Sequence, residues 1–162
     1  MKKIIYPLIF IFILTGINSC AGYKPIFGAS DLKIKITKFE ISGDKQLGRK
    51  IYNKLNKLSK SNSETDKIKN ISIKIDTSKN KIATVKNSTG KILAYRINLS
   101  SKIIITDSET KNQILNTTIS NSSTYQVQDQ FSETIKLEKK SEGNLIIKTY
   151  EDLVIKLSEN IL

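Results

Sequence analysis

Apolar and polar residues alternate in four separate stretches of the chain, which is the pattern of half-buried β-strands. These stretches are residues 31–41, 71–86, 93–106 and 115–127. In the first, the alternation slips by one residue before Phe39, which predicts a β-bulge. Asn87-Ser88-Thr89-Gly90 predicts a turn between the second and third. The third, with the longest alternation, predicts one core-facing set: Leu93, Tyr95, Ile97, Leu99, Ile103 and Ile105.

Two further stretches repeat their apolar residues every three or four positions, which is typical of amphipathic helices. The first covers residues 44–60, follows the strand-breaking Ser42-Gly43-Asp44, and has the stripe Leu47, Ile51, Leu55 and Leu58. The second begins near Phe131, runs to the end of the chain, and has the stripe Ile146, Tyr150, Leu153, Leu157 and Ile161. Ser141-Glu142-Gly143-Asn144 predicts a break or kink in this last helix, because glycine disfavours a helix interior.

The predicted order is therefore strand, helix, three strands, helix. The apolar faces of the four strands and of both helices can all be buried together if the two helices cover one face of a single sheet. We expect an α+β fold: a single four-stranded sheet, mostly antiparallel or mixed, with both amphipathic helices on one face. Residues 31–162 are expected to form this single domain.

The N-terminus predicts export and a lipid anchor. Lys2 and Lys3 precede an apolar run over residues 4–17, which is shorter than the roughly 20 residues of a membrane span and suits a signal peptide over residues 1–19. Ile17-Asn18-Ser19-Cys20 resembles the bacterial lipobox, although Asn18 is not the usual small residue there. That resemblance implies cleavage before Cys20, followed by attachment of diacylglycerol and an N-acyl chain to it. The alternative is an ordinary signal peptide with a chance cysteine.

Composition excludes several kinds of site. The chain has a formal charge of +12, no His and one Cys. A Ser-His-Asp triad, a Cys-His pair and a His/Cys zinc site therefore cannot be built, and no catalytic or metal-binding residue is predicted. Nucleic-acid binding would fit the charge, but the signal peptide directs the protein elsewhere. A secreted hydrolase remains an alternative, although no spacing of acidic residues indicates one.

After Cys20 and Ala21 comes Gly22-Tyr23-Lys24-Pro25-Ile26-Phe27-Gly28. This stretch resembles the Cys-Gly-Phe-x-Pro-Leu-Tyr-Gly start of the lipopolysaccharide-assembly lipoprotein family, LptE. Gly22, Pro25 and Gly28 match, Tyr23 and Phe27 are conservative replacements, and Ala21 is an extra residue. Residues 20–30 are then the lipidated cysteine and its tether.

The resemblance implies a periplasm-facing lipoprotein of the outer membrane that performs no catalysis. Ala21, at the position after the cysteine, favours the outer membrane by analogy with enteric sorting rules. Members of the family sit as a plug in the lumen of a large β-barrel, LptD, assist its assembly, and help to deliver lipopolysaccharide to the cell surface. The expected partners are therefore an LptD-like barrel, lipopolysaccharide and, through the lipid anchor, the membrane, but not nucleic acid.

The predicted strands fit this role because their outward faces are polar and rich in hydroxyl groups, as the wall of a barrel lumen is. Residues of this face are Arg96, Asn98, Ser100, Thr118, Ser120, Ser122 and Thr124. We expect Arg96, Lys102 and Lys74 to contact the phosphates of lipopolysaccharide. The alternative is another small outer-membrane lipoprotein, either an accessory factor or a carrier with an apolar cavity for lipid.

Overall fold

The computed structural model describes residues 32–61 and 68–161. Its elements are β1 (Ile34–Gly43), α2 (Lys45–Ser61), β2 (Lys69–Lys86), β3 (Ile92–Asp107), β4 (Gln113–Gln126) and α3 (Phe131–Ile161). The predicted order of strands and helices is therefore confirmed. Cys20 and the motif residues lie outside the described residues: Gly22, Tyr23, Pro25, Phe27 and Gly28.

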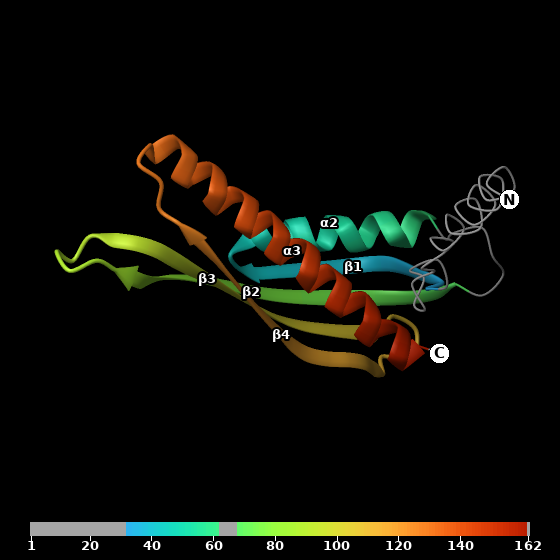
Figure 1. The fold of residues 1–162 in the computed structure, drawn as a ribbon. Coiled ribbons are helices and arrows are strands. Elements are labelled where there is room, and N and C mark those ends of the chain that lie inside the picture. The colour runs from blue at the N-terminus through green and yellow to red at the C-terminus, as the bar shows by residue number, and fades with distance from the viewer. Residues whose placement is uncertain (1–31, 62–67, 162) are drawn as a thin grey trace, which may run out of the picture.

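The strands form one sheet in the order β1-β2-β3-β4. β1 and β2 are parallel because α2 carries the chain back between them, whereas β2, β3 and β4 form an antiparallel meander. Both helices lie on the same face of this sheet, and α3 crosses it diagonally (Figure 1). The expected α+β architecture with a mixed sheet is confirmed.

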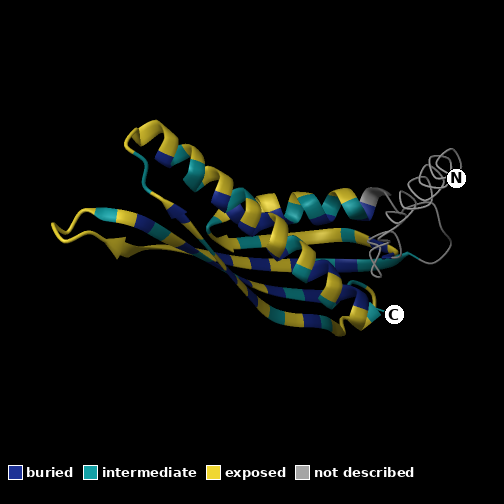
Figure 2. Cartoon of the chain, in the orientation of Figure 1, coloured by how far each residue is buried: buried dark blue, intermediate teal, exposed yellow. Residues whose placement is uncertain are grey.

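The core lies between this face of the sheet and the two helices, as the buried positions in Figure 2 show. Isoleucines from adjacent strands meet there, for example Ile73 opposite Ile105 and Ile75 opposite Ile103. Ile51 and Leu55 of α2 and Leu153 of α3 close the core from above and are fully buried. Alternating isoleucine suits a pleated sheet because its branched side chain packs well there. Of the predicted core-facing set of β3, Leu93 is an exception at 40% exposure, because the register with β2 shifts there and leaves Leu93 as the extra residue of a bulge between Ile92 and Ala94.

The junction of β1 and α2 is built by close backbone contacts. The predicted bulge in β1 is confirmed between Ile36 and Lys38. At the end of β1, Gly43 has a φ of +67°, and a Cβ atom there would overlap the backbone oxygen of Thr77. The next residue, Asp44, caps α2 by accepting a hydrogen bond from the backbone N–H of Leu47 at 3.1 Å.

The predicted break at Ser141-Glu142-Gly143-Asn144 is wrong, because α3 continues through these residues. A glycine inside a helix costs about 1 kcal/mol relative to alanine. Burial of Leu145 and Ile146, two and three residues after Gly143, offsets this cost, since each large apolar side chain contributes roughly 1.5–3 kcal/mol. No helix within the two described ranges is long and apolar enough to span a membrane.

Two glycine substitutions are expected to have opposite effects. Gly143→Ala should raise the free energy of unfolding by about 0.5–1 kcal/mol, because a Cβ atom there meets nothing within 4 Å and alanine favours the helix. Gly43→Ala should lower the free energy of unfolding by about 1–3 kcal/mol, because alanine is strained at a positive φ and its Cβ atom would clash with Thr77. Urea denaturation measures both, and a stabilised Gly43→Ala protein would contradict this account of the junction.

Candidate functional site

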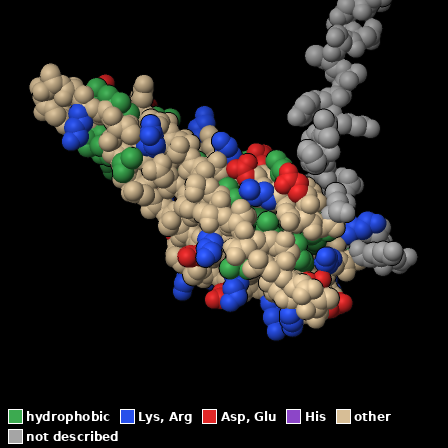
Figure 3. Space-filling view, turned by 90° about the horizontal axis from the view of Figure 1, so that it is seen from below, with side chains coloured by type: hydrophobic (Ala, Val, Ile, Leu, Met, Phe, Trp, Pro, Cys, Tyr) green, Lys and Arg blue, Asp and Glu red, His purple; other side chains and the backbone are tan. Residues whose placement is uncertain are grey.

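The face of the sheet turned away from the helices has an uncharged polar centre. Cross-strand pairing places Ser78, Ser100 and Ser120 in one row, and Asn80, Asn98 and Ser122 in the next. The hydroxyl groups of Ser100 and Ser120 lie 3.1 Å apart and share a hydrogen bond. Seen from this side in Figure 3, the middle of the molecule consists mainly of uncharged polar and backbone atoms. The centre is therefore a patch of small hydrogen-bonding groups, which we call the hydroxyl face.

Charged residues lie on both sides of the hydroxyl face. On one side, Lys74 forms an ion pair with Glu40 of β1, with Nζ and Oε2 2.8 Å apart, and Lys102 is paired across the strands with Asp76. On the other side, Arg96 lies between Ile82 and Thr124. The structure thus places the three candidate lipopolysaccharide contacts, Lys74, Arg96 and Lys102, on the predicted outward face.

These three cations do not form one cluster. Arg96 and Lys102 are separated by six positions along β3, or roughly 20 Å at 3.3 Å per residue. Lys74 and Lys102 lie near each other, but an acidic residue lies beside each of them: Glu40 and Asp76. Arg96 is the candidate cation without an acidic residue directly opposite it. One phosphate group therefore cannot bind all three.

The projecting end of the β2–β3 hairpin is both basic and apolar. No acidic residue occurs between Asp76 and Asp107, whereas the basic residues there are Lys79, Lys81, Lys86, Lys91, Arg96 and Lys102. Ile82, Val85 and Leu93 of this hairpin are exposed, as is Phe131 at the start of α3. Figure 3 shows hydrophobic side chains gathered at this end of the molecule. Such an end attracts anionic groups and offers apolar contacts beside them.

A cluster of charged and aromatic side chains ties the hairpin to α3. The Nζ atom of Lys81 lies 2.6 Å from the Glu138 carboxylate and 4.4 Å from the ring centre of Tyr95. The hydroxyl group of Tyr125 donates a hydrogen bond of 2.8 Å to the same carboxylate. A second ion pair joins Lys79 to Glu142, one helical turn further on.

These contacts keep both charged groups in their ordinary ionised states. Burial by itself would raise the pKa of Glu138, but Lys81 and the Tyr125 hydroxyl outweigh it, so the pKa is lowered. Burial would likewise lower the pKa of Lys81, but its bonds to Glu138 and Tyr125 raise it. A general acid or base needs a pKa near the working pH, and both shifts lead away from neutrality. The cluster therefore fits a structural tie.

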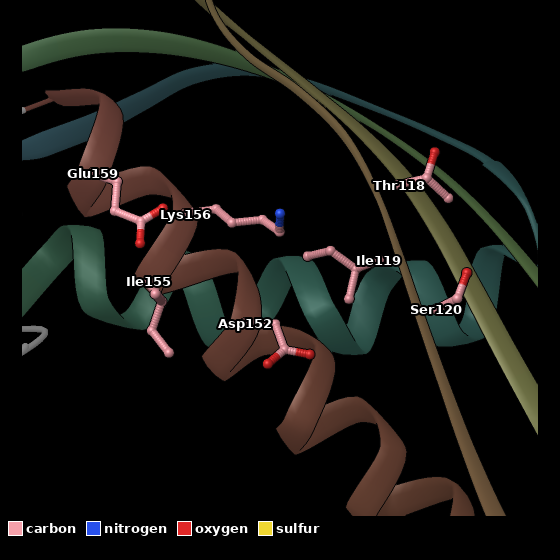
Figure 4. A pocket seen from close by; sticks show the side chains of 7 residues that line it. All are labelled: Thr118, Ile119, Ser120, Asp152, Ile155, Lys156 and Glu159. Carbon is pink, nitrogen blue, oxygen red and sulfur yellow. The ribbon is translucent and has the colours of Figure 1, made fainter.

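Among the described residues, two grooves on the surface and one closed interior gap bear on binding. Between the sheet and the helices, the gap lined by Leu47, Leu99 and Leu145 leaves no room for a water molecule. A groove of about 320 Å³ lies at the hairpin end, and one of about 380 Å³ lies between β4 and α3. Figure 4 shows the second, with Asp152, Lys156 and Glu159 of α3 on one side and β4 on the other.

Comparison with solved structures shows that the fold is shared with small bacterial lipoproteins. A minor lipoprotein from Acinetobacter baumannii matches with a TM-score of 0.56 and 13% identity, over 80% of this chain and 92% of that one. An uncharacterized lipoprotein B from Nitrosomonas europaea matches with a TM-score of 0.51 and 11% identity, over 80% and 90% of the two chains. Identities this low show the fold alone. No family model matches the chain, and no curated protein matches it either.

Sequence reasoning missed the Lys81–Glu138–Tyr125 cluster and the apolar hairpin end. The cluster joins residues from β2, β4 and α3, and nothing local marks Lys81 among so many lysines. A signal for the hairpin end was present in the sequence, because Ile82, Val85 and Leu93 flank the predicted turn at Asn87-Ser88-Thr89-Gly90, and all three are exposed.

The cluster predicts a pH-dependent contribution to stability. Glu138→Gln keeps an oxygen that accepts the Tyr125 hydrogen bond but removes the charge beside Lys81. At pH 7 the free energy of unfolding should fall by about 0.5–1 kcal/mol, the upper range for a partly exposed pair. Because folding lowers the pKa of Glu138 from its ordinary value of 4.5, this stabilisation is present above that value and is lost as the pH falls through the folded pKa.

Denaturation of both proteins between pH 3 and pH 7 tests this, with Glu151→Gln, an exposed position of α3, as the control. The difference between wild type and Glu138→Gln should shrink at the acidic end. A difference that stays constant over this range would show that the charge of Glu138 does not carry the effect.

Proposed function

We propose that this chain is an outer-membrane lipoprotein, anchored by lipid on Cys20 and facing the periplasm. In this proposal it assists assembly of an LptD-like β-barrel, plugs that barrel, and takes part in lipopolysaccharide transport to the cell surface. It acts without catalysis and without a cofactor other than the lipid on Cys20.

The observation that carries the proposal is the hydroxyl face. A domain inside a barrel lumen meets a wall of polar side chains. Short hydroxyl and amide groups on a broad sheet can exchange hydrogen bonds with such a wall without burying unpaired charge. The fold shared with bacterial lipoproteins and the lipobox-like Ile17-Asn18-Ser19-Cys20 support the same proposal.

The carrier alternative is less well supported. A lipid held between sheet and helices needs an apolar cavity, and the gap lined by Leu47, Leu99 and Leu145 is closed. The groove of about 320 Å³ at the hairpin end is open to the surface, and the Lys81–Glu138 pair lies at its wall.

The proposal predicts that a bulky group on the hydroxyl face blocks the barrel. Tagged full-length protein, recovered from membranes in mild detergent, should bring with it one large β-barrel in near-equal amount. Ser78→Tyr, in the centre of the sheet, should lower barrel recovery by about tenfold, equivalent to about 1.4 kcal/mol. Asn53→Tyr, on the exposed side of α2, should leave recovery unchanged. Recovery of the wild type without any barrel would overturn the proposal.

Substitution of the two arginines of the chain, Arg49 and Arg96, tests contact with lipopolysaccharide. Arg96→Glu should weaken binding of purified lipopolysaccharide by about tenfold at low salt, and the loss should diminish as salt screens the charges. Arg49→Glu makes the same charge change on α2 and should have a much smaller effect. Equal effects of both substitutions would show that net charge alone, and not Arg96, determines binding.

A further inference from the structure

From Leu115 to Gln126, the edge of β4 that faces away from β3 has no charged residue, proline or bulge, and the one register shift of the strand lies before this stretch, at Ile114. Proteins protect an exposed edge with charged residues, prolines, bulges or a covering segment. β1, at the other edge, carries Lys35, Lys38 and Glu40 as well as a bulge. β4 has 14 residues and not one that is charged or a proline, in a chain that is 26% charged.

The register shows which backbone groups point out from this edge. The N–H group of Val127 donates to the carbonyl oxygen of Leu93 at 2.9 Å, and Ala94 lies opposite Gln126. In an antiparallel pair, alternate residues bond to the neighbouring strand and the residues between them point away. The register is unbroken from Leu115 to Gln126, so the outward N–H and C=O groups are those of Asn116, Thr118, Ser120, Ser122 and Thr124.

Beside this edge lies the groove of about 380 Å³. In Figure 4, Ile119 points from β4 toward α3, whereas Thr118 and Ser120 point to the other side of the sheet. On α3 the groove presents Ile155, which is 40% exposed, together with Asp152, Glu159 and Lys156. A strand added to β4 would place every second side chain in this groove.

We propose that β4 is a docking edge that binds an extended segment of another protein as a fifth strand of the sheet. Backbone hydrogen bonds to the outward groups of β4 supply affinity, and the groove supplies selectivity. On the side facing α3, the segment carries an apolar residue for Ile155 and a basic residue for Asp152 and Glu159. On its other side it carries small polar residues that extend the hydroxyl face.

Charge favours a different protein over a second copy of this chain as the occupant. A second copy paired through its own β4 would offer no basic side chain to Asp152 and Glu159, because β4 carries no charged residue. The groove has two acidic side chains and one basic side chain, which attracts a basic segment. This inference is independent of the hydroxyl face, because the edge binds through the backbone of β4.

Proline and alanine at the same position separate the backbone from the side chain. Thr118→Pro and Ser122→Pro each remove one outward N–H group, and because these groups do not bond to β3, an edge strand tolerates the change. Thr118→Ala and Ser122→Ala remove the same side chains but keep the N–H. Circular dichroism and thermal melting of the purified variants verify that all four fold.

The measurement is hydrogen exchange by mass spectrometry on the full-length protein, in isolated membranes and after purification in detergent. In membranes, peptides covering residues 116–124 should exchange at least about tenfold more slowly than in the purified protein, while peptides of β1 should be unchanged. Each proline variant should weaken this protection by about three- to tenfold, the effect of one lost hydrogen bond, and the alanine variants should not.

Other outcomes overturn the inference. Equal exchange of residues 116–124 in both preparations means that the edge stays free. Slow exchange in the purified protein that depends on its concentration means that a second copy covers the edge. Slow exchange of residues 116–124 in the purified protein at every concentration means that another part of the same chain covers the edge. Protection that survives both proline substitutions means that backbone hydrogen bonding to β4 is not the cause.

Discussion

The structure depends on burial of only one face of a four-stranded sheet. Isoleucines on alternate positions of β2 and β3, among them Ile73, Ile75, Ile103 and Ile105, pack under α2 and α3. Because the side-chain period of a strand is two, fixing these residues inside fixes their neighbours outside. The hydroxyl face is therefore a direct consequence of the core, and a shift of one residue in register would destroy both.

Most of the fold was predictable because its signals are local. Alternation predicted the strands, the slip before Phe39 predicted the bulge, and the stripe of Leu47, Ile51 and Leu55 predicted α2. The break predicted near Gly143 failed because packing of α3 on the sheet outweighs the helix propensity of one residue. The prediction that Leu93 faces the core failed because a bulge in β3 interrupts the alternation at that residue, and the spacing of apolar residues does not mark it.

The candidate site was predictable only in part. Periodicity correctly placed Arg96 and Lys102 on one face with the serines and threonines of β4. It did not show that Lys74 is paired with Glu40, or that Arg96 lies far from the other two cations, because both depend on strand pairing across the sheet. The unprotected edge of β4 became visible only when the strand order showed that, within residues 32–61 and 68–161, no strand lies beyond it.

The two outer surfaces have separate physical origins. The hydroxyl face can bind a polar wall through side chains, whereas the edge of β4 can bind a chain through its backbone. At the hairpin end, Lys81 and Glu138 hold β2 against α3, which keeps the basic and apolar residues there in a fixed place relative to the sheet. A protein organised in this way can contact a large partner through the sheet and keep α2 outside the contact.

The central claim is that the hydroxyl face, and not the helix layer, meets the partner. Photo-crosslinking amino acids placed one at a time at Ser78 and Asn98, and at Lys50 and Asn53 of α2, test it in intact membranes. The account predicts adducts with one large barrel protein from Ser78 and Asn98 and none from the α2 positions. Adducts from α2 with none from the sheet would contradict it.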